Sequence, residues 1–394
     1  DAARQRHRDY FVALAEQAEP KLRGPEQAIF MDRLDTELDN LRQVLSYCET
    51  ADDAMVQKGL ELMHLLSNFW LIREHLNEGR QHCAAMLERA ETFDPTPDKA
   101  NVWMLAGNIA LCLGESAVAR QNFETSLALR QQLGERQGLA GPLGSLGNIS
   151  QRLGDYSAAQ RYFEESVAIC REFDLLNFEA VGLTCLSNLA LEQQRFEEAR
   201  ARAHEALLVC RQIGNLGIEC FVLHGLSNIA LAQGDYATAV SFCEQTLVVE
   251  EKVGHTLTRA SALCNLATAR SLLGETAAAA RIYCECLSVK AEGGDLRAAD
   301  DILENVGDFL SRQAHQKAAC VLWGLGERMR EDSESPRTPS DQGWYDRAVA
   351  KVRQSLESSV IEAAWAEGRA MTIADGIAYA LRETEAVRAA SETY

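Results

Sequence analysis

Basic residues are scarce in this chain. Its 394 residues include 39 Lys and Arg against 58 Asp and Glu, a formal net charge of −19 at pH 7. A protein that holds nucleic acid on its own surface needs clustered Lys and Arg, because the phosphate backbone supplies much of the attraction. The same deficit argues against attachment to an anionic membrane surface.

Long apolar runs and export signals are also missing. No uncharged apolar stretch approaches the roughly 18 residues that a membrane-spanning helix requires, and the N-terminus shows no secretory signal. A cytoplasmic protein is therefore expected. Because the chain begins at Asp1 rather than at Met, it is also expected to be part of a longer polypeptide.

Catalytic motifs are absent as well. The sequence contains no His-Glu-x-x-His, no Gly-x-Ser-x-Gly, no Asp-rich metal loop and no Gly-x-x-x-x-Gly-Lys-Ser/Thr phosphate loop. The glycine-rich segment 141–147 lacks the lysine of such a loop, so close helix approach explains it better. We therefore predict a non-enzymatic protein that needs no cofactor.

The twelve cysteines include no Cys-x-x-Cys pair. Most fall on apolar positions of predicted helices, such as Cys112, Cys185 and Cys264, which favours reduced thiols used as small hydrophobic side chains. Cys220 and His224 are one helical turn apart and could share a metal ion. Two ligands without a third make a weak site, so no metal site is predicted.

What the sequence does contain is a repeat. Leu146-Gly147-Asn148-Ile149 returns forty residues later as Leu186-Ser187-Asn188-Leu189, and again as Leu226-Ser227-Asn228-Ile229. When the sequence is written in lines of forty residues, several positions carry similar residues in every line, and we call each such position a column. The asparagine column holds Asn68, Asn108, Asn148, Asn188, Asn228, Thr268 and Asp308; the turn column Glu74, Gly114, Gly154, Gln194, Gly234, Gly274 and Ala314; and the small-residue column Gly79, Ala119, Ala159, Ala199, Ala239, Ala279 and Ala319.

Each repeat is predicted to form two helices. Leu and Ile recur at helical spacing in its first half, and the turn-column glycine suits a left-handed helix C-terminus. The Asp that follows, as in Asp155 and Asp235, can cap the second helix. The fold class is therefore all-α, a solenoid in which antiparallel helix pairs with a period of about 40 residues form a right-handed superhelix.

The third repeat resembles the tetratricopeptide repeat. The residues that match that motif are Leu146, Gly147, Gly154, Asp155, Tyr156, Ala159 and Phe163. The resemblance implies seven such repeats over residues 55–330, each longer than the usual 34 residues. Residues 1–54 are predicted to form an N-terminal helical cap, 331–342 a polar linker broken by two prolines, and 343–394 a C-terminal helical cap.

The two ends resemble a more specific family. Arg6-His7-Arg8-Asp9-Tyr10-Phe11, Leu38-Asp39-Asn40-Leu41-Arg42 and Ala363-Ala364-Trp365-Ala366-Glu367-Gly368-Arg369-Ala370 are similar to segments that border the repeat domain of bacterial signal-transduction ATPases with numerous domains (STAND proteins), which include LuxR-type, MalT-like and AfsR-like regulators. The resemblance implies a sensor domain for signal transduction and transcription regulation. Its partners would be an upstream nucleotide-binding domain of the same polypeptide and an effector.

In tetratricopeptide repeats, the asparagine column faces the concave groove, where an amide can pair with a ligand's backbone. The alternative is that these amides bond neighbouring helices or water. The predicted groove residues are Asn68, Asn108, Asn148, Gln151, Arg152, Thr184, Asn188, His224 and Asn228. The expected ligand is a peptide, a protein or a small molecule. A passive protein-binding scaffold is the alternative function.

Overall fold

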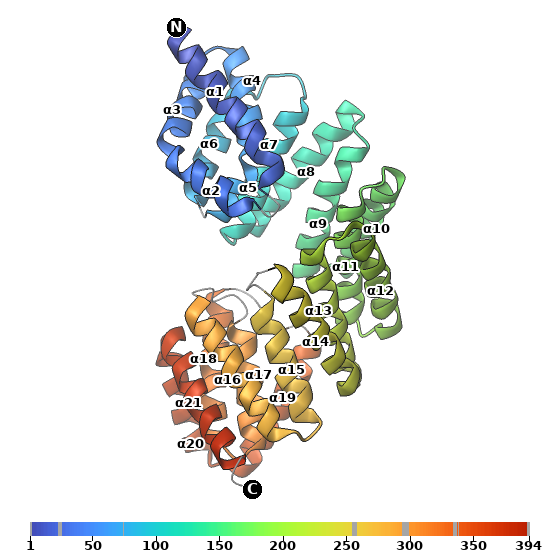
Figure 1. The fold of residues 1–394 in the computed structure, drawn as a ribbon, viewed down its shortest axis with the longest axis vertical. Coiled ribbons are helices and arrows are strands. Elements are labelled where there is room, and N and C mark those ends of the chain that lie inside the picture. Colours follow the sequence, from blue (N-terminus) through green and yellow to red (C-terminus); the bar gives the residue numbers. More distant parts are fainter. Residues whose placement is uncertain are drawn as a thin grey trace. The chain divides into compact units, whose positions relative to one another are not determined.

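A computed structural model of the chain describes residues 2–22, 26–73, 75–253, 258–293, 299–333, 337 and 339–391. All the regular structure in these residues is helical, which confirms the predicted all-α class. The chain divides into two compact units, residues 1–174 and 175–394. Figure 1 labels the helices of both units.

The first unit opens with four helical elements. These are α1 (Ala2–Ala18), the 3₁₀ turn η1 (Glu19–Lys21), α2 (Gln27–Thr36) and α3 (Leu38–Thr50). The sequence predicts a single helix through Leu34, Leu38, Leu41 and Leu45, and all four leucines are buried. That prediction is wrong in one respect, because the helix breaks at Glu37, whose φ of −99° and ψ of 7° are not helical. Gly24 and Pro25, the predicted start of the helix, lie outside the described residues.

The rest of the first unit consists of helices that pack mainly on their sequence neighbours. They are α4 (Asp53–Leu65), α5 (Ser67–Ile72), α6 (Leu76–Arg89), α7 (Pro97–Cys112), α8 (Ser116–Leu133), the turn η2 (Gln137–Leu139), α9 (Ala140–Arg152) and α10 (Tyr156–Glu172). The closest packing joins α7 to α8 and α9 to α10. A continuous core of buried side chains runs from Phe11 to Ile109 and includes Phe69 and Trp70.

The second unit begins with four helix pairs and ends with three further helices. The pairs are α11 (Leu176–Glu192) with α12 (Phe196–Ile213), α13 (Leu216–Gln233) with α14 (Tyr236–Val253), α15 (Arg259–Leu272) with α16 (Thr276–Gly293), and α17 (Ala299–Arg312) with α18 (Gln316–Asp332). The first helices also pack side by side, α11 on α13, α13 on α15 and α15 on α17.

The closing helices are α19 (Pro339–Ser355), α20 (Ser358–Ala370) and α21 (Ile373–Ser391). Among them, α20 packs on α18, while α21 packs on α16 and α17. Thr372 caps α21 by accepting a hydrogen bond from the Asp375 backbone N–H at 3.1 Å, as its sequence predicts. The predicted boundaries at residues 54, 330 and 342 stay predictions.

The turn column adopts the left-handed conformation that its glycines predict. φ is 76° at Gly154 and 77° at Gly234, and it stays positive where glycine is replaced, at 57° in Gln194 and 65° in Ala314. A side chain with a Cβ is strained in this region. The backbone geometry of the repeat therefore persists where the sequence does not favour it. Glu74 of this column lies outside the described residues.

Pairs of residues with complementary volumes join the two helices of a repeat. A Cβ added to Gly107 would lie 2.3 Å from the Phe123 ring, and one added to Gly147 would lie 2.5 Å from the Phe163 ring. Where the second helix carries the smaller Ala203, the first helix carries Ser187 instead of glycine. The glycine-rich segment 141–147 thus reaches its close helix contact at Gly147.

Hydrogen bonds between the helices of a pair show that they run antiparallel. Ser187, near the end of α11, donates to the Ala199 carbonyl near the start of α12 at 2.8 Å. Ser166, in the second half of α10, donates to the Ala140 carbonyl at the start of α9 at 2.9 Å. Asp155 accepts from the Ala158 N–H at 3.0 Å and so caps α10 as expected.

α13 is, among the described helices, the one long and apolar enough to cross a membrane by length and composition, with a mean hydropathy of 1.2. Half of its apolar window is buried inside the unit, and it packs on α11, α14 and α15. It therefore has the surroundings of a core helix. None of the twelve cysteines is in a disulfide and most are buried, but Cys112 is exposed, so the prediction that it packs as a hydrophobic side chain is wrong.

Candidate functional site

The predicted groove residues of the first unit lie on three of its helices. Asn68 in α5 and Asn108 in α7 are half-buried, whereas Asn148 in α9 is exposed. Gln151 is half-buried, and Arg152 is exposed at the C-terminus of α9. Their assignment to a ligand groove stays a prediction.

Asn188 of α11 is the predicted amide with the most accessible polar groups in the second unit. Its side chain is exposed, and within the part of the chain that the structure describes it has no recorded hydrogen-bond partner. A Cβ added to Gly225 of α13 would lie 3.7 Å from its Oδ1 atom. The amide therefore faces the next first helix at a position that offers no side-chain donor. One turn earlier, Thr184 donates to its own helix, to the Ala180 carbonyl at 2.7 Å.

Asn228 occupies the equivalent position in α13 and has different surroundings. Its Oδ1 accepts a 2.6 Å hydrogen bond from the Nδ2 of Asn265 in α15. The same Asn265 nitrogen donates to Ser227 at 2.9 Å. The Asn228 Nδ2 lies 3.4 Å from the Nε2 of His224. At this repeat the amide links neighbouring helices, as the alternative reading of the column predicts.

His224 belongs to the same polar group. Its Nδ1 lies 3.4 Å from the Asn265 Nδ2, and burial lowers the pKa of its imidazole to about 4. The neutral ring can therefore accept a hydrogen bond at physiological pH. Burial, followed by the charge of Glu250, raises the pKa of the Cys220 thiol to about 12. Cys220 thus faces α14 while His224 faces α15, so the two side chains have different neighbours.

Large apolar side chains are exposed on the same helix faces. Phe178 and Val181 of α11 are 50% and 46% exposed, and Phe221 of α13 is 54% exposed. Residues three or four apart share a helix face, so Val181, Thr184 and Asn188 line one side of α11. We call Phe178, Val181, Thr184, Asn188, Phe221, His224 and Asn228 the α11–α13 stripe.

Sequence reasoning missed the apolar half of this stripe and the role of Asn265. The signal for the apolar residues was available, since Val181 and Phe221 each lie seven residues before an asparagine of the column. Two helical turns of about 3.6 residues place them on the same face. Asn265 lies three residues before Thr268, outside the column, and only the packing of α13 on α15 connects it with Asn228.

The stripe can bind a ligand that offers both amides and apolar groups. The Asn188 side chain supplies one acceptor and two donors, which match a peptide backbone. Large apolar side chains exposed on a helix face are typical of interaction surfaces when they form a patch with their neighbours. The described residues contain no group of three or more His, Cys, Asp or Glu side chains placed to hold a metal ion.

Stacked antiparallel helix pairs with a recurring left-handed turn define a helical-repeat solenoid, a class of interaction domain. The chain carries tetratricopeptide repeats, because the model of that family matches residues 98–172 and 218–292. The first match lies in the first unit and the second match in the second unit, and both confirm the predicted repeat type. No curated protein matches the chain in sequence.

Solved structures share the fold at low identity. The apo form of RapI is 13% identical, with a TM-score of 0.57 over 70% of this chain and 97% of that one. Aspartyl phosphate phosphatase F from Bacillus subtilis is 12% identical, with a TM-score of 0.53 over 89% and 94%. A Signal Transduction ATPase with Numerous Domains that has a tetratricopeptide repeat sensor, from Pyrococcus horikoshii, is 12% identical. Its TM-score is 0.50 over 94% of this chain and 53% of that protein.

Proposed function

We propose that this chain is a non-enzymatic sensor domain that binds an extended peptide segment along the α11–α13 stripe. The observation that carries the proposal is the exposed Asn188 amide beside exposed Val181 and Phe221 on neighbouring helices. The peptide backbone would pair with the Asn188 amide, and an apolar side chain of the peptide would cover the exposed aromatic rings. A Rap protein of similar fold has been crystallised in complex with the Competence and Sporulation Factor, which supports this mode of use.

The sensor would act by linkage. A ligand shifts a conformational equilibrium only by the difference between its affinities for the two states. The peptide would therefore favour whichever arrangement of α11, α13 and α15 binds it better. The Asn228–Asn265 bond ties two of these helices together, so a change at the stripe would reach α15 directly.

We further propose that the chain is the cytoplasmic sensor part of a STAND-class regulator. The segments at residues 6–11, 38–42 and 363–370 resemble the borders of such a domain, and the structure with a tetratricopeptide repeat sensor has the same fold. In that case the predicted caps, residues 1–54 and 343–394, would join the repeats at 55–330 to a nucleotide-binding domain and an output module. A passive scaffold is the second candidate.

A selection from a phage-displayed random-peptide library tests the binding site. Fluorescence anisotropy then measures the selected peptides on the unmodified chain and on Asn188→Ala and Phe221→Ala variants. Each substitution should weaken binding about tenfold, which corresponds to about 1.4 kcal/mol. Both side chains are exposed, so neither change should alter the free energy of unfolding by more than about 0.5 kcal/mol.

Leu208→Ala is the matched control. Leu208 is an apolar side chain 70% exposed on α12, outside the stripe, so its truncation should leave peptide affinity unchanged. Failure to enrich any peptide, or equal loss of affinity in all three variants, would refute the site. If the peptide binds but hydrogen exchange changes only within α11 and α13, the passive-scaffold function holds instead of the sensor.

A further inference from the structure

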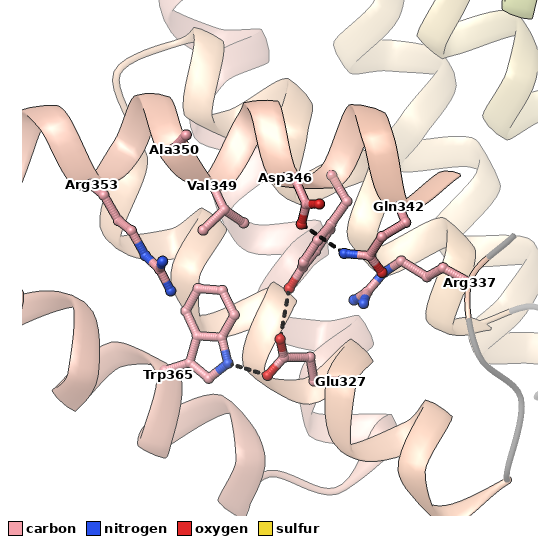
Figure 2. A pocket seen from close by; sticks show the side chains of 9 residues that line it. Glu327, Arg337, Gln342, Asp346, Val349, Ala350, Arg353 and Trp365 are labelled. Carbon is pink, nitrogen blue, oxygen red and sulfur yellow. Dashed lines mark hydrogen bonds between the residues drawn. The ribbon is translucent and has the colours of Figure 1, made fainter. Parts of the chain in front are cut away.

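A cavity lies in the C-terminal part of the second unit, and none of the residues that line it belongs to the α11–α13 stripe. Its volume is about 330 Å³, and it lies between α18, α19 and α20 (Figure 2). Glu327 comes from α18, Tyr345 and Arg353 from α19, and Trp365 from α20. A cavity of this size is at the small end of natural ligand sites.

The aromatic wall of the cavity is held in place by hydrogen bonds. The Glu327 carboxylate accepts from the Trp365 Nε1 at 2.7 Å and from the Tyr345 hydroxyl at 3.3 Å. The Trp323 ring packs behind both, with its centroid 6.2 Å from that of Trp365 and 5.9 Å from that of Tyr345. A ligand would therefore meet rings whose orientation is already fixed, which reduces the entropy lost on binding.

One of the two arginines that line the cavity is already neutralised. Arg337 stacks on the Tyr345 ring, 3.5 Å from its centroid. Its guanidinium donates to both oxygens of the buried Glu304, at 2.6 Å and 3.2 Å. Its charge is thus compensated from behind the cavity wall. The other charged groups of the lining are Arg353, Asp346 and Glu327, whose carboxylate lies 4.0 Å from the Arg369 guanidinium.

These remaining charges have opposite signs. Arg353 is exposed, and no ion pair is recorded for it within the described ranges of the chain. Figure 2 shows Arg353 and Glu327 on either side of the Trp365 indole, with Asp346 farther along α19. Two carboxylates would repel a phosphate-bearing ligand, and the arginine would repel a simple organic cation. A zwitterion avoids both penalties.

We propose that this cavity binds a free α-amino acid with an apolar side chain. The ligand's carboxylate would pair with Arg353, its ammonium group would pair with Glu327, and its side chain would cover the indole of Trp365. A planar guanidinium can engage both oxygens of a carboxylate. A volume of about 330 Å³ accommodates one amino acid, so the proposed ligand differs in class from the peptide proposed for the α11–α13 stripe.

Isothermal titration calorimetry on the full chain tests the proposal, with L-leucine, L-methionine, L-phenylalanine and L-tryptophan as probes. At least one should bind with a dissociation constant below about a millimolar. For the best amino acid, the N-acetyl derivative lacks the ammonium charge and the amide derivative lacks the carboxylate, so each should bind at least about tenfold more weakly. No binding by any of the four probes would overturn the proposal.

Arg353→Gln tests the contact with the ligand's carboxylate separately from the contact with its ammonium group. It should weaken the free amino acid about tenfold but leave the already weakened amide derivative unchanged. Arg347→Gln is the matched control, because Arg347 is exposed on the same helix but does not line the cavity. Equal affinity in the Arg353 variant, or stronger binding of ATP than of any amino acid, would overturn the proposal. Peptide binding at the stripe is measured separately, so each result stands alone.

Discussion

The contact between Gly147 and Phe163 can be tested with the substitution Gly147→Ala. Its effect on stability should be unfavourable when Phe163 is present and favourable when Phe163 is replaced by alanine. A Cβ at Gly147 would lie 2.5 Å from the Phe163 ring, closer than real Cβ contacts allow. Gly147→Ala therefore overpacks the pair, at a cost of about 1–3 kcal/mol. Against this, alanine is more favourable than glycine inside a helix by about 1 kcal/mol. The net effect in the native background should be a loss of stability of up to about 2 kcal/mol.

Removing the ring removes the clash. Phe163→Ala alone should destabilise by about 3–5 kcal/mol, because the side chain is fully buried. In that background Gly147→Ala should become stabilising by about 1 kcal/mol, since only the helix preference remains. The coupling between the two positions should thus equal the overpacking cost, about 1–3 kcal/mol.

Urea unfolding followed by circular dichroism gives the free energies, and hydrogen exchange of α9 and α10 shows whether the effect is local. Gly144→Ala is the control in the same helix. Its added Cβ would lie 3.7 Å from the nearest atom, the Ser166 Oγ, which is an ordinary contact. It should stabilise by about 1 kcal/mol in both backgrounds. Additivity of Gly147→Ala and Phe163→Ala within about 0.5 kcal/mol would refute the packing argument.

Three further predictions concern backbone strain, protonation and the end of the array. Ala314→Gly should stabilise by about 1 kcal/mol in urea unfolding, because φ at Ala314 is 65°; Ala201→Gly, at an exposed position inside α12, should destabilise by a similar amount. Burial lowers the folded-state pKa of His224 to about 4, whereas an unfolded histidine titrates near 6.5. The unfolded chain therefore binds the extra proton between these values, and the free energy of unfolding should fall by about 2.5 kcal/mol as pH drops from 6.5 to 4. His224→Gln should weaken that fall. Deletion of residues 1–54 should remove hydrogen-exchange protection from α4 and α6, whose buried side chains share its core, and leave α17 and α18 protected.

The sequence predicted the helix pairs and turns well, because they depend on local chemistry that repeats. Gly154 and Gly234 specify a left-handed turn, and Asp155 specifies a cap, whatever surrounds them. The prediction of one continuous helix was wrong at Glu37, because the leucines keep their helical spacing although the helix breaks there. Periodic apolar residues indicate which face is buried, but two short helices can share one buried face as well as a single helix can.

The candidate site was less predictable, because its properties depend on pairs of residues rather than on columns. Thr184 and Asn188 share one face of α11, as their spacing predicts, but their place in a ligand groove stays a prediction. Whether an amide is available, however, is decided by a residue on the next helix. The cavity beside Trp365 could not be predicted, since two of the three helices that form it, α19 and α20, lie outside the periodic part of the chain.

Asn188 and Asn228 differ in the residue that each faces on the next helix. Exchanging those two facing residues tests whether they decide the availability of each amide. The residue opposite Asn188 is Gly225, and the equivalent residue opposite Asn228 is Asn265, which donates to it at 2.6 Å. Gly225→Asn should give Asn188 the same partner. It should stabilise the chain by about 1 kcal/mol through one hydrogen bond and a better helix former, and it should weaken peptide binding at the stripe.

The converse change, Asn265→Gly, should release Asn228 and lower stability by about 1–2 kcal/mol in urea unfolding. Anisotropy with the selected peptides measures the effect of both variants on binding. If Gly225→Asn stabilised the chain but left the affinity unchanged, the Asn188 amide would not contact the peptide. If it changed neither property, Asn188 would not face α13 in solution. The asparagines of the column are thus separate sites. At each one, the residue on the next helix decides whether the amide is hydrogen-bonded within the protein or available to a ligand.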